Sequence, residues 1–90
     1  MKVKKGFVLR EVMDEFIVMP TGDNIAAFDG TVILNEVSAF LWKKMEQPCS
    51  KEDLLRALLD EYDVTENQAR QDLDALLQKL DDMGVLEMDA

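Results

Sequence analysis

The stretch from Phe28 to Trp42 constrains the fold of this 90-residue chain more than any other. It contains Asp29-Gly30, a strong turn signal, and then the apolar, β-branched run Thr31–Leu34, which is typical of a strand. Asn35 follows as a helix N-cap, because its side-chain oxygen can accept an otherwise unpaired amide of the first helical turn. The sequence therefore predicts a strand joined directly to a helix, so that the helix fixes the position of the strand.

Strand signals dominate the part of the chain before this stretch. Phe7–Val12 and Phe16–Met19 are dense in strand-forming residues and are separated by a short connection, which predicts a hairpin. The turn formers of Pro20–Asn24 end the second strand. Residues 25–28 fit a strand or an irregular return, and we favour an extended conformation.

Helix signals dominate the part that follows. We expect a helix from Asn35 to near Glu46, a second one capped by Ser50, and a third that begins with a Thr65–Gln68 capping box and ends at Gly84. Their apolar stripes are Val37, Phe40, Leu41 and Met45, then Leu54, Leu55, Leu58, Leu59 and Tyr62, then Ala69, Leu73, Leu76, Leu80 and Met83. Residues 85–88 leave room for a short terminal strand or an extended tail.

This order of elements predicts an α+β domain with a winged-helix-like plan, in which a small three-stranded antiparallel sheet is followed by three α-helices. We expect one domain over residues 7–88, preceded by a flexible basic N-terminus at residues 1–6. No internal repeat or linker divides the chain.

Composition excludes most catalytic chemistry. The chain has no histidine and a single cysteine, Cys49, which removes the commonest general base, the commonest metal ligand and any internal disulfide. We therefore assign no catalytic residue, no metal site and no cofactor, and expect a protein that is not an enzyme. With no signal peptide or apolar run of membrane-spanning length, a cytoplasmic location is the default.

The charge argues against nucleic acid. The chain carries a net charge of −9, and the predicted third helix holds two basic residues against five acidic ones. A DNA-reading helix has to neutralise phosphates, so we expect no binding of nucleic acid. The acidic body would attract basic segments of a partner, although it can equally serve solubility alone.

The predicted strand at residues 31–34 is the most specific candidate site. An open sheet edge presents free N–H and C=O groups, and neither charge nor proline guards this one, so a partner peptide could add as a further strand. The alternative is a strand that is central or covered by the C-terminal tail. The same open edge would allow a weak edge-strand dimer of an otherwise monomeric protein. Leu77 and Arg70 lie at one margin of the third helix's apolar stripe, where they could line a groove beside the sheet or simply border the core.

Several segments together resemble one family, the PqqD-like proteins, also known as RiPP precursor-peptide recognition elements. The residues that carry the likeness are Phe7–Val12, Phe16–Pro20, Leu34-Asn35-Glu36 leading into Ala39-Phe40-Leu41-Trp42, Glu61–Val64, Asp72, Leu76 and Gly84-Val85-Leu86. The likeness covers nearly the whole chain, and its most specific part runs from Leu34 to Trp42.

The resemblance implies a non-catalytic domain that binds the leader of a ribosomally made, post-translationally modified peptide and presents it to a modifying enzyme, often a radical SAM enzyme. It implies that the leader pairs with the third strand in a cleft shared with the third helix. Carried over by position, the peptide-binding residues are Thr31, Val32, Ile33, Leu34, Arg70, Leu73 and Leu77. The resemblance does not assign the chain to synthesis of pyrroloquinoline quinone.

Two other functions remain open from the sequence. One is an acidic interaction or regulatory module that binds a basic partner through its helical face. The other, a distant third, is a DNA-binding winged helix.

Overall fold

A computed structural model of the protein describes residues 1–22 and 32–87. The predicted turn at Asp29-Gly30, the open question at residues 25–28 and the first residue of the predicted edge strand, Thr31, lie outside these residues. In chain order, the elements are β1 (Lys2–Val3), β2 (Phe7–Val12), β3 (Glu15–Pro20), β4 (Val32–Leu34), α2 (Glu36–Lys44), α3 (Lys51–Glu61), α4 (Glu66–Asp82) and β5 (Leu86–Glu87).

The predicted hairpin is confirmed as β2 and β3, which pair antiparallel from Phe7↔Pro20 to Val12↔Glu15. The connection consists of Met13 and Asp14, whose φ angles are 50° and 69°. Two consecutive residues in the left-handed region give a two-residue turn whose twist matches that of the strands. Aspartate tolerates this conformation better than methionine does.

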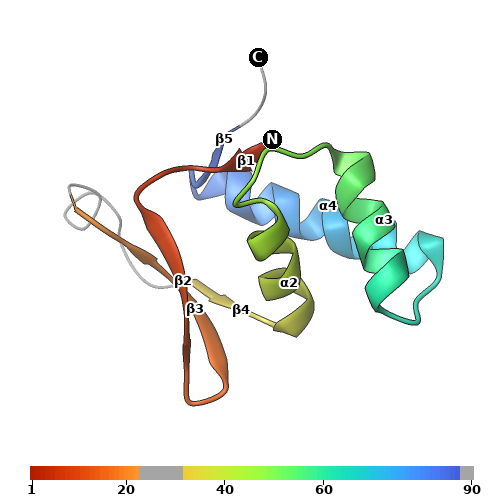
Figure 1. Ribbon diagram of the computed structural model, residues 1–90, viewed down its shortest axis with the longest axis horizontal. Coiled ribbons are helices and arrows are strands. Elements are labelled where there is room, and N and C mark those ends of the chain that lie inside the picture. Colours follow the sequence, from red (N-terminus) through yellow and green to blue (C-terminus); the bar gives the residue numbers. More distant parts are fainter. Residues whose placement is uncertain (23–31, 88–90) are drawn as a thin grey trace.

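β4 completes a three-stranded antiparallel sheet in the order β2-β3-β4. The sheet lies to one side of the helices, and α4 passes behind α2 in the view of Figure 1. Val18, Val32 and Leu34 are buried and belong to the core shared with the helices. The sheet followed by three helices is the α+β architecture that the sequence predicts.

α2 begins where the sequence predicts, because Asn35 Oδ1 accepts the Ser38 amide at 2.8 Å. Its buried face differs from the predicted stripe. Trp42, which lies beside that stripe, is fully buried, whereas Val37 and Phe40 are only partly buried. The reason is that α2 contacts both β4 and α3, so it buries a wider sector of its surface than one apolar stripe.

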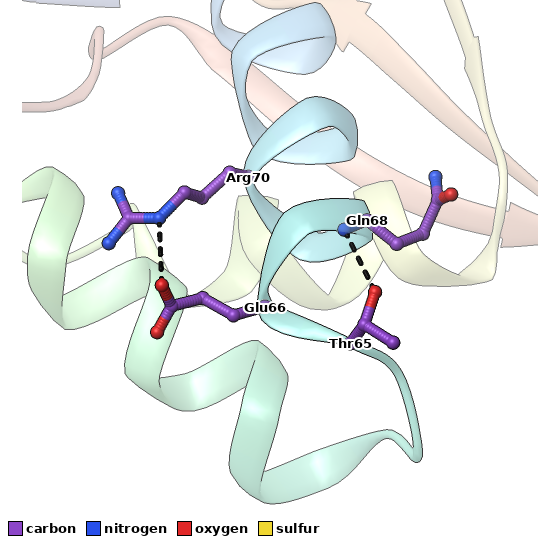
Figure 2. Close-up of polar contacts among 4 residues, drawn as sticks. All are labelled: Thr65, Glu66, Gln68 and Arg70. Atoms are coloured by element: carbon purple, nitrogen blue, oxygen red, sulfur yellow. Dashed lines mark hydrogen bonds and ion pairs between the residues drawn. The ribbon is translucent and has the colours of Figure 1, made fainter.

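Ser50 and Thr65 are the N-caps of α3 and α4, as predicted, but the cap at Thr65 differs in one hydrogen bond. Ser50 forms a full capping box with Asp53, since each side chain accepts the other residue's amide at 3.0 Å. Thr65 Oγ1 accepts the Gln68 amide at 3.1 Å (Figure 2). The return bond from the Thr65 amide to the Gln68 side chain is not formed, and the Gln68 side chain instead lies along the helix, where its Nε2 donates to Asp72 Oδ1 at 2.8 Å. Asp72 lies four residues further along the helix, and its charged acceptor makes this hydrogen bond stronger than one between two neutral groups.

The end of α4 is confirmed at Gly84, whose φ is 72°. The Gly84 amide donates to Asp81 O and the Val85 amide donates to Leu80 O, the paired bonds that close a helix with a left-handed residue. The short strand that residues 85–88 allow is present as β5.

The first three residues do not form the flexible lead-in expected of residues 1–6. Lys2 and Val3 pair with Glu87 and Leu86 in a second, two-stranded sheet. The Val3 amide also donates to Met45 O, and the Lys4 amide to Val85 O, both at 2.9 Å. This role was not predicted, because basic residues dominate the segment. The side chains that it buries are those of the apolar Met1 and Val3. β1 and β5 thereby fasten both ends of the described chain to the helical core (Figure 1).

We expect Val3→Ala to lower the free energy of unfolding by about 1–2 kcal/mol, because it removes two buried carbon groups from the core. Lys4→Ala is the matched control, since that side chain is exposed, and it should change stability by less than about 0.5 kcal/mol. Urea unfolding followed by the fluorescence of Trp42, the sole tryptophan, measures both. Equal, small effects would contradict a structural role for β1.

Candidate functional site

β4 is an edge strand within the part of the chain that the structure describes. It pairs with β3 through Val18↔Val32, Ile17↔Ile33 and Phe16↔Leu34, and β3 separates it from β2. Successive residues of an antiparallel strand direct their N–H and C=O groups to opposite neighbours. β4 therefore has backbone groups that point away from β3, toward the open side of the sheet.

The side chains of β4 hold the strand in place while its backbone remains at the edge. Val32 and Leu34 are buried, and Ile33 between them is 53% exposed. Neither charge nor proline occurs from Val32 to Leu34, the two devices by which proteins commonly block an edge. Asn35 caps α2 immediately after the strand, so the end of β4 is fixed by the start of a helix.

A hollow of about 250 Å³ opens where β4 passes into α2. It separates the first turns of α2 from the middle of α4. Its walls are Asn35, Val37, Ser38 and Leu41 on one side and Asp72, Ala75, Leu76 and Lys79 on the other. Aliphatic side chains are thus accompanied by one carboxylate and one ammonium group, an arrangement suited to an apolar side chain with polar neighbours.

The predicted helix residues occupy other places. Leu73 is fully buried in the core. Arg70 lies in the early turns of α4, where its Nε is 3.3 Å from Glu66 Oε2 (Figure 2). Leu77 lines a different hollow, together with Lys51 and Asp74, which form an ion pair between α3 and α4. Arg70, Leu73 and Leu77 thus lie in three different settings, of which only that of Leu73 is the core that it shares with Val32 and Leu34 of β4.

Helix geometry explains this placement. At 100° per residue, Leu76 and Leu77 lie on opposite sides of the line through Leu73. The hollow next to β4 is on the Leu76 side, while the side of Leu77 faces the start of α3. Both residues border the apolar stripe, and the sequence carries no signal for which border faces the strand. Ala75 was not predicted to line this hollow, because a small residue on the exposed side of a helix has no distinctive sequence pattern.

The pKa shifts in the structure do not create an acid or base that titrates near neutral pH. Backbone and side-chain hydrogen bonds from Ser50 lower the pKa of Asp53, and Arg56 lowers it further. Desolvation, followed by the charges of Glu36 and Glu61, raises the pKa of Tyr62. Both shifts move the group away from the range in which an acid–base catalyst titrates at neutral pH.

Residues 1–22 and 32–87 contain no group of three or more potential metal-ligating side chains. None of the helices in these two ranges is long and apolar enough to cross a membrane.

The sequence profile of the family described as "Coenzyme PQQ synthesis protein D (PqqD)" matches residues 15–86, which is most of the chain. The protein belongs to the PqqD family. The match includes β3, β4 and all three described helices, so the candidate edge lies within the family region. No curated protein matches the chain closely enough to add a named relative.

Two solved structures share the fold of this PqqD-family protein. One is described as "TbiB1 in Complex with the TbiA(beta) Leader Peptide", with a TM-score of 0.78 and 23% identity over 100% of this chain and 99% of that one. The other, "Lasso peptide synthetase B1 complexed with the leader peptide", has a TM-score of 0.71 and 17% identity over 90% of this chain and 89% of that one. At these identities the likeness establishes the fold.

The placement of Leu73 and Leu77 leads to a direct test. Leu73→Ala should lower the free energy of unfolding by about 2–5 kcal/mol, because it leaves a cavity in the core. Leu77 is only partly buried, so Leu77→Ala should lower the free energy of unfolding by clearly less. Urea unfolding monitored by Trp42 fluorescence compares the two. A Leu73→Ala protein as stable as the wild type would contradict the burial of Leu73.

Proposed function

We propose that this PqqD-family protein is a non-catalytic adaptor that captures the leader of a ribosomally made precursor peptide. The leader adds as a fourth strand along residues 31–34, and the adaptor presents it to a separate modifying enzyme. The observation that carries the proposal is the edge position of β4, with Val32 and Leu34 anchored in the core. Family membership supports the proposal, as does the fact that both structural neighbours were solved with leader peptides.

Strand addition accounts for both affinity and selectivity. Main-chain hydrogen bonds to β4 would hold the leader whatever its sequence, while its alternate side chains would be read by the surroundings. Guest side chains level with Val32 and Leu34 would point toward the helices, and those level with Ile33 would point outward. The inward ones would approach the hollow between α2 and α4, where Ala75 and Leu76 offer apolar contact and Asp72 and Lys79 offer opposite charges.

The helix wall of the site is therefore assigned to Asp72, Ala75, Leu76 and Lys79, the residues that α4 contributes to the hollow. Thr31 and the contributions of Arg70, Leu73 and Leu77 remain predictions. In this arrangement Leu73 would support the wall from inside the core.

The remaining parts of the proposal concern the cellular setting. The adaptor acts in the cytoplasm, needs no cofactor of its own and delivers its peptide to a radical SAM enzyme or another peptide-modifying enzyme. Without peptide it is a monomer or a weak dimer joined through the same strand edge.

Backbone amide NMR tests the proposal. Synthetic peptides covering the short open reading frames beside this gene would be titrated into ¹⁵N-labelled protein. We expect the amide signals of Val32–Leu34 and of residues 72–79 to shift. Ile33→Pro should weaken binding by at least about tenfold, because it removes one backbone donor of the ladder.

Ile33→Thr is the matched control, because it keeps both the backbone N–H and a β-branched side chain. It should bind within about threefold of the wild type, a difference of under 1 kcal/mol. Circular dichroism would verify that the helices persist in both variants. Salt-sensitive binding of a basic peptide that leaves β4 unshifted and survives Ile33→Pro would contradict strand addition and favour the acidic helical-face alternative.

A further inference from the structure

The sheet carries an exposed apolar surface that a strand paired along β4 would leave uncovered. Val12 is 48% exposed, Met13 92%, Met19 45% and Ile33 53%; among the described residues, one other large apolar side chain, Val64, is classed as exposed. These four residues come from the hairpin and the strand beside it. Together with the partly exposed Ile17, they are named the hairpin surface.

The register places this surface on the side of the sheet away from the helices. Cross-strand partners share a face, so Ile17 and Ile33 lie side by side and Met19 lies next to Val8. The alternate residues of the same strands, such as Val18 and Val32, are buried toward the helices. The hairpin surface is therefore a flat outer face that continues into the turn, not a margin of the core.

Met13 shows that folding alone does not explain the surface. Its φ of 50° lies in the left-handed region, which is unfavourable for a residue with a long side chain and suits asparagine or glycine better. Its side chain is almost completely exposed, so no packing within the protein offsets this cost. A flexible thioether held out in this way suits contact with an irregular apolar surface on another molecule.

Charge indicates the kind of molecule. An open hollow of about 340 Å³ at the turn end of the sheet joins Ile33 to four carboxylates, those of Glu11, Asp14, Glu15 and Glu36. Of the four, Glu15 shares the outer face with its partner Val12, and Asp14 belongs to the turn. Two basic side chains lie nearby: Arg10, the partner of Ile17, and Lys43, whose Nζ is 5.8 Å from the centre of the Phe16 ring. The apolar surface is thus bordered at this end by net negative charge, which attracts a basic rim and repels a second acidic copy, a phosphate backbone or an anionic membrane.

We propose that the hairpin surface docks the peptide-modifying enzyme, through an apolar patch on that enzyme bordered by lysine and arginine side chains. The identity of this partner rests on the proposed function; the surface itself does not. Ile33 belongs both to the strand edge and to the hairpin surface, so an enzyme seated there would lie next to a leader paired along β4. The adaptor would then use the edge of its sheet for the peptide and the outer face for the enzyme.

Binding of the purified modifying enzyme encoded beside this gene, measured by calorimetry without peptide, tests the proposal. Met13→Asn should weaken enzyme binding by about tenfold, the effect expected when an apolar side chain that becomes buried at an interface is replaced by a polar one. The same variant should be at least as stable as the wild type, because asparagine accepts the left-handed conformation. Loss of folding therefore cannot account for the expected loss of binding.

Two matched pairs separate apolar contact from charge. Met19→Gln should weaken enzyme binding, whereas Val64→Ser, a substitution at an exposed apolar residue outside the sheet, should not. Glu15→Lys should weaken it more than Asp60→Lys, which makes the same charge change on an exposed residue of α3. Peptide titrations with the same variants should leave the shifts of Val32–Leu34 unchanged, which distinguishes failure of docking from failure of leader binding.

Three results would overturn the proposal. The first is no binding of the enzyme to the wild type, and the second is equal affinity for Met13→Asn, Met19→Gln and the wild type. The third is a dimer in analytical ultracentrifugation that Met13→Asn and Met19→Gln abolish, which would make a second copy the occupant of the hairpin surface.

Discussion

The structure depends on a three-residue strand that is held by its side chains and left open along its backbone. Burial of Val32 and Leu34 fixes β4 against the helices, and pairing with β3 satisfies one side of its backbone. Its position is fixed further because Asn35 begins α2 at once. A rigid edge of this kind is prepared for a guest strand, because little conformational entropy remains to be lost by the protein when the guest binds.

The rest of the chain serves to keep that edge rigid and accessible. α4 is closed by Gly84 and leads into β5, which pairs with β1, so the two ends of the described chain fasten each other to the helical core. The two surfaces of the sheet region differ in kind. The edge of β4 offers hydrogen bonds and a hollow beside Ala75, whereas the outer face offers apolar side chains bordered by carboxylates. In the proposed function, one small acidic domain would contact a peptide and a protein at adjoining places.

Local signals in the sequence predicted most of the elements, since turns, caps and periodic stripes act over a few residues. Asn35 and Gly84 illustrate this, because each solves a hydrogen-bonding problem within its own helix end. Features set by distant contacts were missed. The pairing of β1 with β5 joins opposite ends of the sequence, and whether Leu76 or Leu77 borders the hollow at the start of α2 depends on how α4 packs. The family resemblance supplied the idea of a peptide on the strand, and the structure shows which residues of α4 line the hollow at the start of α2.

Hydrogen–deuterium exchange of the β4 backbone amides tests the central claim most directly. Those amides of Val32–Leu34 that point away from β3 should exchange quickly in the free protein, since no strand of the described chain pairs with them. They should become protected when a leader peptide binds, while the amides of α3 keep their rates. Amides on that side that are already protected in the free protein, or that stay unprotected in the complex, would contradict the account.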